Sequence, residues 1–172
     1  MQQPTYIIFD ATGVSDHQNS NFPFLNTLSA WQHSYPERFK FNDLVDVLFC
    51  STHSLQDDGT LRGYLQKKMD QADSMIVLAS KLLRKDSTIL NWQVTRAISR
   101  NIPIIVTYVG EDKLSAEMLP ALQNRLPQAL VKAIAQGLKV AHIPFTMDKI
   151  ERACKNYSKE RAVYAWTGNT IY

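Results

Sequence analysis

The chain has 172 residues, of which 45% are hydrophobic and 20% are charged. This composition is typical of a globular domain with its own hydrophobic core, and it excludes wholesale disorder. The net charge of only +3 argues against a polycationic binder of nucleic acid or of an acidic membrane surface. The six glycines are widely scattered, so the chain contains neither a G-x-G-x-x-G dinucleotide fingerprint nor a phosphate-binding P-loop.

The amino-terminal residues and the cysteines bear on the compartment. Residues 1–4 lack the basic stretch and the apolar run of a secretory signal. Apolar stretches elsewhere fall well short of the roughly 20 residues that a membrane-spanning helix needs. We therefore expect a cytoplasmic protein that does not contact a membrane. Cys50 and Cys154 are far apart in apolar or mixed sequence, and we expect two buried free thiols rather than a disulfide.

Short apolar runs alternate along the chain with segments whose apolar residues recur at helical spacing. Runs such as Tyr6–Phe9 are β-branched and aromatic, which is typical of strands buried on both faces of a parallel sheet. The predicted elements, in chain order, are a strand at 6–9, a helix over 24–31 that Pro36 closes, a strand or strand edge at 39–43, a helix from Thr60 to Ala72, a strand at 75–79, a helix from Ser87 or Thr88 to Asn101, a strand at 103–109, helical stretches at 115–126 and 128–136, a strand at 140–145 and a helix at 148–157.

Strands and helices that alternate in this way predict an α/β fold. We expect three layers with a central, mostly parallel five-stranded sheet, because strands joined by helical crossovers lie parallel. The sequence contains no repeat and no linker, so we expect a single domain over residues 1–172 with its core at about 5–157. The aromatic residues of the tail, 158–172, are expected to pack back on that domain.

The carboxyl ends of the predicted strands are the place to look for a site, because open α/β sheets bind ligands there. The residues that this rule selects are Phe9 to Thr12, Asp43 to Asp46, Ser80, and Asn91 to Gln93. A structural alternative stands beside each of them: Asp10 can be a turn or cap residue, and Asp43 and Asp46 can be solvated carboxylates. The four histidines lack zinc-ligand spacing, and the chain has no G-x-S-x-G elbow, so we expect neither a metal site nor a serine hydrolase.

The helix that begins near Ser87 carries the most informative of these residues. At about 100° per residue, Gln93 lies roughly 80–90° from the centre of the helix's apolar stripe, at the margin of the core face. Trp92 points further from that face and is expected to be half-exposed. In the structural alternative, Trp92 packs under a loop and Gln93 is a surface amide.

Several segments together resemble the TIR-like proteins of the bacterial Thoeris anti-phage systems. The likeness covers residues 5–110 and, more weakly, 140–150. The segments that carry it are Tyr6–Asp10, Phe39–Asp46, Met75–Ser80, Asn91–Val94 with Ala97, and Asn101–Ile105. The resemblance implies a flavodoxin-like TIR fold. It also implies an enzyme that cleaves NAD⁺ at the nicotinamide–ribose bond and makes an ADP-ribose-derived messenger, cyclic or conjugated.

The resemblance also implies how the protein works and with what. NAD⁺ is the substrate, and no cofactor or metal is needed. The diffusible messenger activates a separate antiviral effector, a phage protein is the trigger, and neighbouring protomers of a homo-oligomer complete the site. The family's catalytic glutamate, in the pattern W-E-I/V, is thought to hold the ribose hydroxyls and to favour an oxocarbenium-like transition state. The residues carried over are Gln93 at the catalytic position, Phe9 and Asp10 on the first-strand side of the pocket, Asp43 and Asp46 in the acidic loop, and Trp92 as a wall.

Gln93 departs from the family pattern, because the expected residue there is Glu. An amide is nearly isosteric with a carboxylate and can still bond to ribose hydroxyls, but it carries no charge. Losing that charge is expected to cost roughly 10²–10⁴-fold in rate. Two interpretations follow: an engineered inactive form, which the otherwise intact surroundings favour, or a natural pseudo-enzyme. The alternative from another class is a non-catalytic TIR-type interaction or nucleotide-sensing module.

Overall fold

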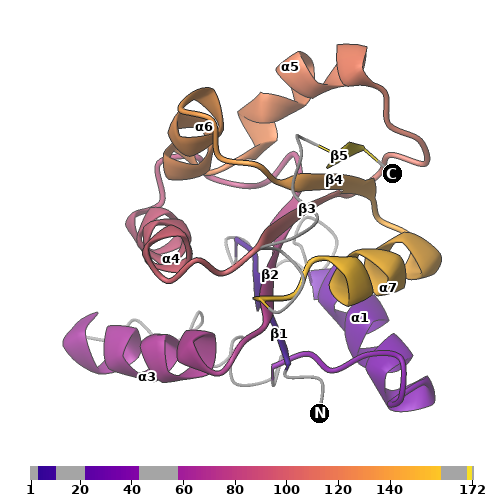
Figure 1. Cartoon of the computed structure of the whole chain (residues 1–172), viewed down its shortest axis with the longest axis horizontal. Helices are drawn as coiled ribbons and strands as arrows, with labels where there is room; N and C mark the ends of the chain where they lie inside the picture. The colour runs from indigo at the N-terminus through magenta and orange to yellow at the C-terminus, as the bar shows by residue number, and fades with distance from the viewer. Residues whose placement is uncertain (1–3, 11–21, 43–57, 160–169, 172) are drawn as a thin grey trace.

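The structure is a computed structural model that describes residues 4–10, 22–42, 58–159 and 170–171, with only the backbone at 22, 58–60 and 170–171. A parallel sheet runs through the middle of the molecule, with helices on both of its faces (Figure 1). The predicted α/β class is therefore confirmed.

Four strands form the body of the sheet, in the order β1 (Thr5–Ile8), β2 (Ser74–Ala79), β3 (Ile104–Tyr108) and β4 (Ala141–Pro144). Every neighbouring pair is parallel. Every residue of these strands is buried, which explains why the strands are largely apolar in sequence. Each strand also holds one buried polar residue: Thr5, Ser74, Thr107 and His142. A two-residue strand, β5 (Thr170–Ile171), pairs with the outer edge of β4.

The segment at 39–43, expected to be a strand or a strand edge, meets the edge of the sheet but forms no full strand over residues 39–42, the part that the structure describes. Phe41 makes only an isolated parallel bridge to Thr5, at the free edge of β1. Two backbone hydrogen bonds hold it there, from Thr5 N to the Lys40 carbonyl and from Asn42 N to the Thr5 carbonyl. The Asn42 side chain then donates to the carbonyl of Lys68, near the end of a helix. With this bridge beside β1, the sheet is compatible with a flavodoxin-like fold.

The helices lie where the apolar spacing predicts them, within a few residues at each end. Their bounds are α1 (Phe22–Ser34), α3 (Asp58–Asp70), α4 (Thr88–Ser99), α5 (Leu119–Leu122), α6 (Gln128–Ala135) and α7 (Met147–Asn156), with 3₁₀ turns at Ala116–Met118 and Gln123–Arg125. Among the described residues, no helix is long and apolar enough to cross a membrane.

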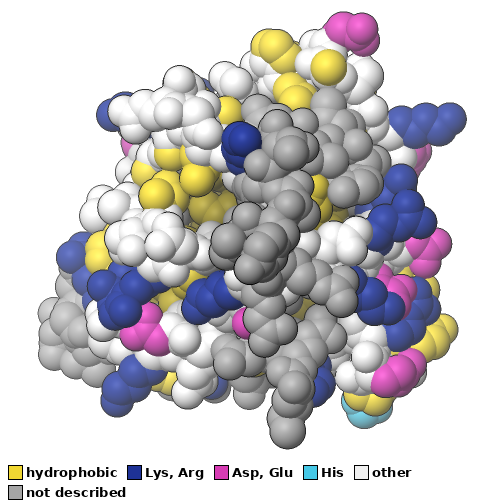
Figure 2. Space-filling view, viewed as in Figure 1, with side chains coloured by type: hydrophobic (Ala, Val, Ile, Leu, Met, Phe, Trp, Pro, Cys, Tyr) yellow, Lys and Arg dark blue, Asp and Glu magenta, His cyan; other side chains and the backbone are white. Residues whose placement is uncertain are grey.

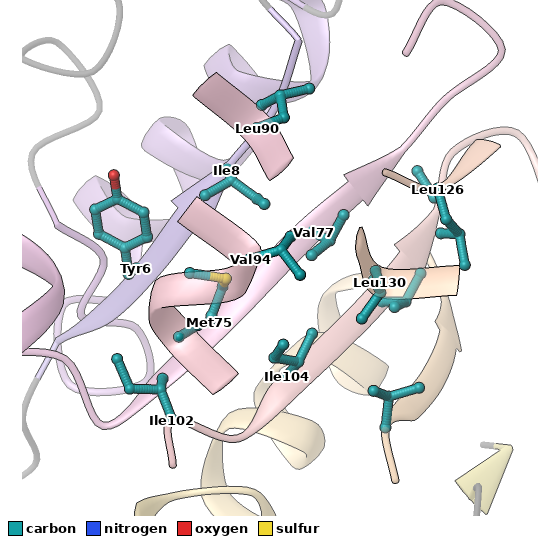
Figure 3. Close-up of a cluster of buried hydrophobic side chains, with 14 of the residues drawn as sticks. Tyr6, Ile8, Met75, Val77, Leu90, Val94, Ile102, Ile104, Leu126 and Leu130 are labelled. Carbon is teal, nitrogen blue, oxygen red and sulfur yellow. The ribbon is translucent and has the colours of Figure 1, made fainter. Parts of the chain in front are cut away.

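Two hydrophobic cores lie on opposite faces of the sheet. The larger one packs α3, α4 and α6 against β1, β2 and β3, and Figure 3 shows its side chains pointing toward one another. The smaller one packs α1 and α7 against the other face. Residues next to each other in a strand alternate between the cores, so that Ile76 belongs to the smaller core and Val77 to the larger one. The predicted three layers follow from this alternation.

The cysteines are only partly described. Cys154 in α7 is a free, buried thiol, as expected from its sequence context. Burial raises its pKa to about 11, so the thiol stays protonated at neutral pH. Cys50 lies outside the described residues.

Candidate functional site

Gln93 lies in the second turn of α4, on the side that faces β1. The hydroxyl of Tyr6 donates a hydrogen bond of 2.7 Å to its Oε1 atom. Its Nε2 atom donates a bond of 3.2 Å to the backbone carbonyl of Ile89, one turn earlier in the same helix. Because Ile89 offers only an acceptor, these two bonds fix which end of the amide is oxygen and which is nitrogen.

The position of Gln93 differs from the expectation that it lies at the margin of the core. It is only 6% exposed, and its partner Tyr6 is completely buried. The angle around the helix locates a residue relative to its own apolar stripe, but it does not show how far the neighbouring elements extend. Here β1 continues beneath the margin of α4, so the margin is interior, and the surface-amide alternative is wrong.

Trp92 lies beside Gln93 but faces another element. Its ring is partly buried against the larger core, which agrees with the expected half-exposure. The guanidinium carbon of Arg62, from α3, lies 5.6 Å from the centre of the indole ring. A cation–π contact of this kind joins α3 to α4. Trp92 therefore contacts α3 as well as the larger core, and its expected role as a wall of the site stays a prediction.

Asp10 follows β1 at the carboxyl edge of the sheet and is only 2% exposed. Arg84, from the loop after β2, pairs with it through Nε at 3.1 Å from Oδ2 and Nη2 at 3.2 Å from Oδ1. The backbone N–H of Arg84 also donates to Oδ2 at 2.6 Å. This hydrogen-bonded pair raises the pKa of Arg84. Asp10 thus ties the segment that leads into α4 to the end of β1, and its charge is already balanced.

Of the remaining predicted site residues, the structure describes Phe9 and Ser80, which are both buried. Phe9 is buried in the smaller core, on the face of the sheet opposite to Gln93. Ser80 is also buried at the end of β2, and its hydroxyl accepts a bond of 3.2 Å from the backbone N–H of Leu82. Asp43 and Asp46 lie outside the described residues. The carboxyl edge therefore brings Asp10, Ser80 and Arg84 together, while Gln93 is enclosed between α4 and β1.

Two residues that shape this region were not selected from the sequence, although each left a signal. Tyr6 places a hydroxyl inside a mostly apolar buried strand, and a buried tyrosine hydroxyl normally has a hydrogen-bond partner. Arg84 belongs to the charged loop that follows β2, at the same sheet edge as Asp10. Neither signal identifies the hydrogen-bond partner, because 87 positions separate Tyr6 from Gln93 and 74 separate Asp10 from Arg84.

Other surface features do not add to this site. A hollow of about 340 Å³ opens at the opposite edge of the sheet, where β3 begins and α6 ends. It is lined mostly by apolar side chains of two segments, one from Ile98 to Ile104 and one that ends at Lys139. Within the described part of the chain, no group of three His, Cys, Asp or Glu residues is arranged to hold a metal ion. On the face shown in Figure 2, Lys and Arg side chains are spread over several elements and are interleaved with acidic ones.

The chain was also compared with known protein families. No family model matches it.

Proposed function

We propose that this chain is a TIR-like domain protein of the kind found in Thoeris anti-phage systems, with a TIR-type, flavodoxin-like fold. Its activity type is cleavage of NAD⁺ to an ADP-ribose-derived messenger, strongly lowered here by Gln93. The observation that carries the proposal is the place of Gln93. It lies on the helix between β2 and β3, next to Trp92 and facing β1, which is where the family pattern W-E-I/V places the catalytic glutamate. The single bridge at Phe41 beside β1 also supports it, since a flavodoxin-like sheet has a strand there.

The chemistry explains why one charge matters. In the proposed reaction, the bond between C1′ of the ribose and the nicotinamide nitrogen breaks, and the electron pair leaves with nicotinamide. Water, or a hydroxyl of the same nucleotide, then adds to C1′ and releases a proton. Positive charge develops on the ribose ring in the transition state, and a carboxylate at 93 would stabilise it where an amide cannot.

The test places a carboxylate at position 93. Gln93→Glu is expected to raise nicotinamide release from NAD⁺ by roughly 10²–10⁴-fold over the unchanged chain. Release is measured with the purified protein, with and without phage capsid protein, from pH 6 to 9. Gln123→Glu is a matched control, because it adds the same charge at an exposed residue of a distant turn. If the Gln93→Glu protein is folded and releases no nicotinamide under any of these conditions, the enzyme proposal is rejected.

A second function is favoured by a specific observation: both polar atoms of the Gln93 amide are bonded to protein groups, and the side chain is 6% exposed. A residue held in this way suits a TIR-type module that binds a nucleotide or assembles with copies of itself without turnover. Such a module would gain thermal stability from NAD⁺ or ADP-ribose, because a ligand that binds only the folded state raises the unfolding midpoint. That stabilisation, and the sedimentation behaviour, would be unaffected by Gln93→Glu.

A further inference from the structure

The hydrogen bonds around Gln93 distinguish an amide from a carboxylate. The Tyr6 hydroxyl presents a donor at 2.7 Å to one end of the side chain, and the Ile89 carbonyl presents an acceptor at 3.2 Å to the other end. An amide has one acceptor end and one donor end, so it satisfies both partners. A carboxylate has two acceptor ends, and its second oxygen would face the Ile89 carbonyl oxygen.

The surroundings leave little room for another arrangement. Tyr6 has no exposed surface, and it is held in β1, which pairs with β2 along its whole length. Ile89 O is part of the α4 backbone and cannot turn away without breaking the helix. Leu90 and Val94, on either side of Gln93 in the helix, are buried in the larger core, where Figure 3 shows them next to Ile8 and Val77. Water cannot readily replace a missing bond at a side chain that is 6% exposed.

We infer that Tyr6 is a positioning residue for the side chain at 93, and that its hydroxyl and the Ile89 carbonyl together make this position accept an amide in preference to a carboxylate. Glutamine is then the residue to which this interior is matched. The match between amide and surroundings stands on these two hydrogen bonds and on burial, whereas its meaning for NAD⁺ chemistry rests on the proposed function. In that chemistry, Tyr6 acts through residue 93 and does not touch the nucleotide.

A double-mutant cycle tests the pairing without any assay of activity. Tyr6→Phe and Gln93→Met each remove one partner of the bond, and each is expected to lower the midpoint of thermal unfolding by about 2–6 °C. The double variant, with two apolar partners, is expected to recover at least half of the summed loss. Tyr35→Phe is the matched control, because that ring is 39% exposed, and its midpoint should stay within about 1 °C. Strictly additive losses would overturn the inference.

The preference for an amide is tested by the charge-restoring variant. Gln93→Glu is expected to unfold about 3–10 °C below the unchanged chain at pH 7.5, while Gln123→Glu is not. If Gln93→Glu releases nicotinamide, adding Tyr6→Phe should lower kcat about tenfold and leave KM within about twofold, since Tyr6 only orients the carboxylate. An unchanged kcat, or a Gln93→Glu protein as stable as its parent, would contradict the inference. An inactive Gln93→Glu protein with the expected stabilities rejects only the proposed function.

Discussion

Burial sets the charge state of two hydrogen-bonded side chains in the middle of the sheet. His142 in β4 is 3% exposed, and its Nδ1 atom lies 2.9 Å from the hydroxyl of Tyr108 in β3. Burial lowers the pKa of His142 to about 4, and burial also raises the pKa of Tyr108. Both side chains are therefore neutral at pH 7, and Nδ1 of His142 can accept a hydrogen bond from the Tyr108 hydroxyl. A neutral pair is the state that an interior of low polarity favours.

The neutral His142 makes folding stability depend on acid. Its pKa is about 4 in the folded state and 6.5 when unperturbed, so the unfolded chain binds the proton first as the pH falls. Stability is complete above pH 6.5 and declines toward pH 4, by about 3 kcal/mol at most.

Urea unfolding at steps between pH 7.5 and 4.5 measures this decline. His142→Gln keeps an acceptor for Tyr108 but does not titrate, so its stability should fall less over the same range. The titration of Glu151 does not contribute to the decline over this pH range. Its hydrogen bonds with Arg38 and Lys155 lower its pKa to about 2, so its own contribution is lost only below pH 4.5. Parallel curves for the parent and His142→Gln would show that His142 does not carry the effect.

At the scale of elements, hydrogen bonds connect α4 to β1 at two places, one in the loop before the helix and one in its second turn. Asp10 and Arg84 join the loop before it to β1, and Tyr6 joins its second turn to the same strand. Asn91 holds α6: its Oδ1 atom accepts a bond of 2.7 Å from the backbone N–H of Ala129. That N–H is in the first turn of α6, where no intrahelical acceptor exists. The orientation of the candidate catalytic position thus depends on β1 and α6 together.

Asn91 is expected to contribute to stability through this joint between α4 and α6. Its Nδ2 atom also donates to the carbonyls of Lys85 and Ser87, both at 2.8 Å. Asn91→Ala removes all these bonds and should lower the free energy of unfolding by about 1–3 kcal/mol. Asn124→Ala, at an exposed turn residue, should change it by less than about 0.5 kcal/mol. Equal urea midpoints for the two variants would mean that the joint does not stabilise the fold.

At the scale of the whole molecule, one sheet separates two cores that must form together. The larger core lies under α3, α4 and α6 and the smaller one under α1 and α7, and both use alternate residues of the same strands. Neither set of helices can bury its apolar face without the sheet between them. We therefore expect the described part of the chain to unfold as one cooperative unit.

Truncation of neighbouring residues in β2 tests whether both faces are equally covered. Ile76 and Val77 are fully buried, but in different cores. Ile76→Ala should cost about 2–5 kcal/mol, and Val77→Ala somewhat less because it removes a smaller group. Leu82→Ala, at a residue that is 43% exposed, serves as the control and should cost little. If urea unfolding shows either core variant to be as mild as Leu82→Ala, that face of the sheet is not packed.

The sequence by itself determined the class of fold and nearly every element in it. The four main strands are mostly apolar because both faces of each are covered, and the helices show the spacing of their buried apolar stripes. Information of this kind is local, since a run of five or six residues reports its own environment. The alternation at 39–43 indicated a strand or a strand edge, and it could not distinguish them, because one bridge from Phe41 to Thr5 produces the same local pattern as a short strand. The pairing of Thr170 and Ile171 with β4 left no such run.

Only the tertiary structure decided what surrounds the candidate site. Position 93 could be selected as a candidate from the resemblance, but its burial could not be predicted, because burial depends on β1, whose Tyr6 lies 87 positions earlier. The state of Asp10 likewise depends on Arg84, which reaches it from another loop. Such contacts are set by how the strands and helices pack, and hydrogen bonds between distant residues have no period in the sequence. The sequence shows that residue 93 is an uncharged amide, and only the fold supplies the donor at Tyr6 and the acceptor at Ile89 that suit it.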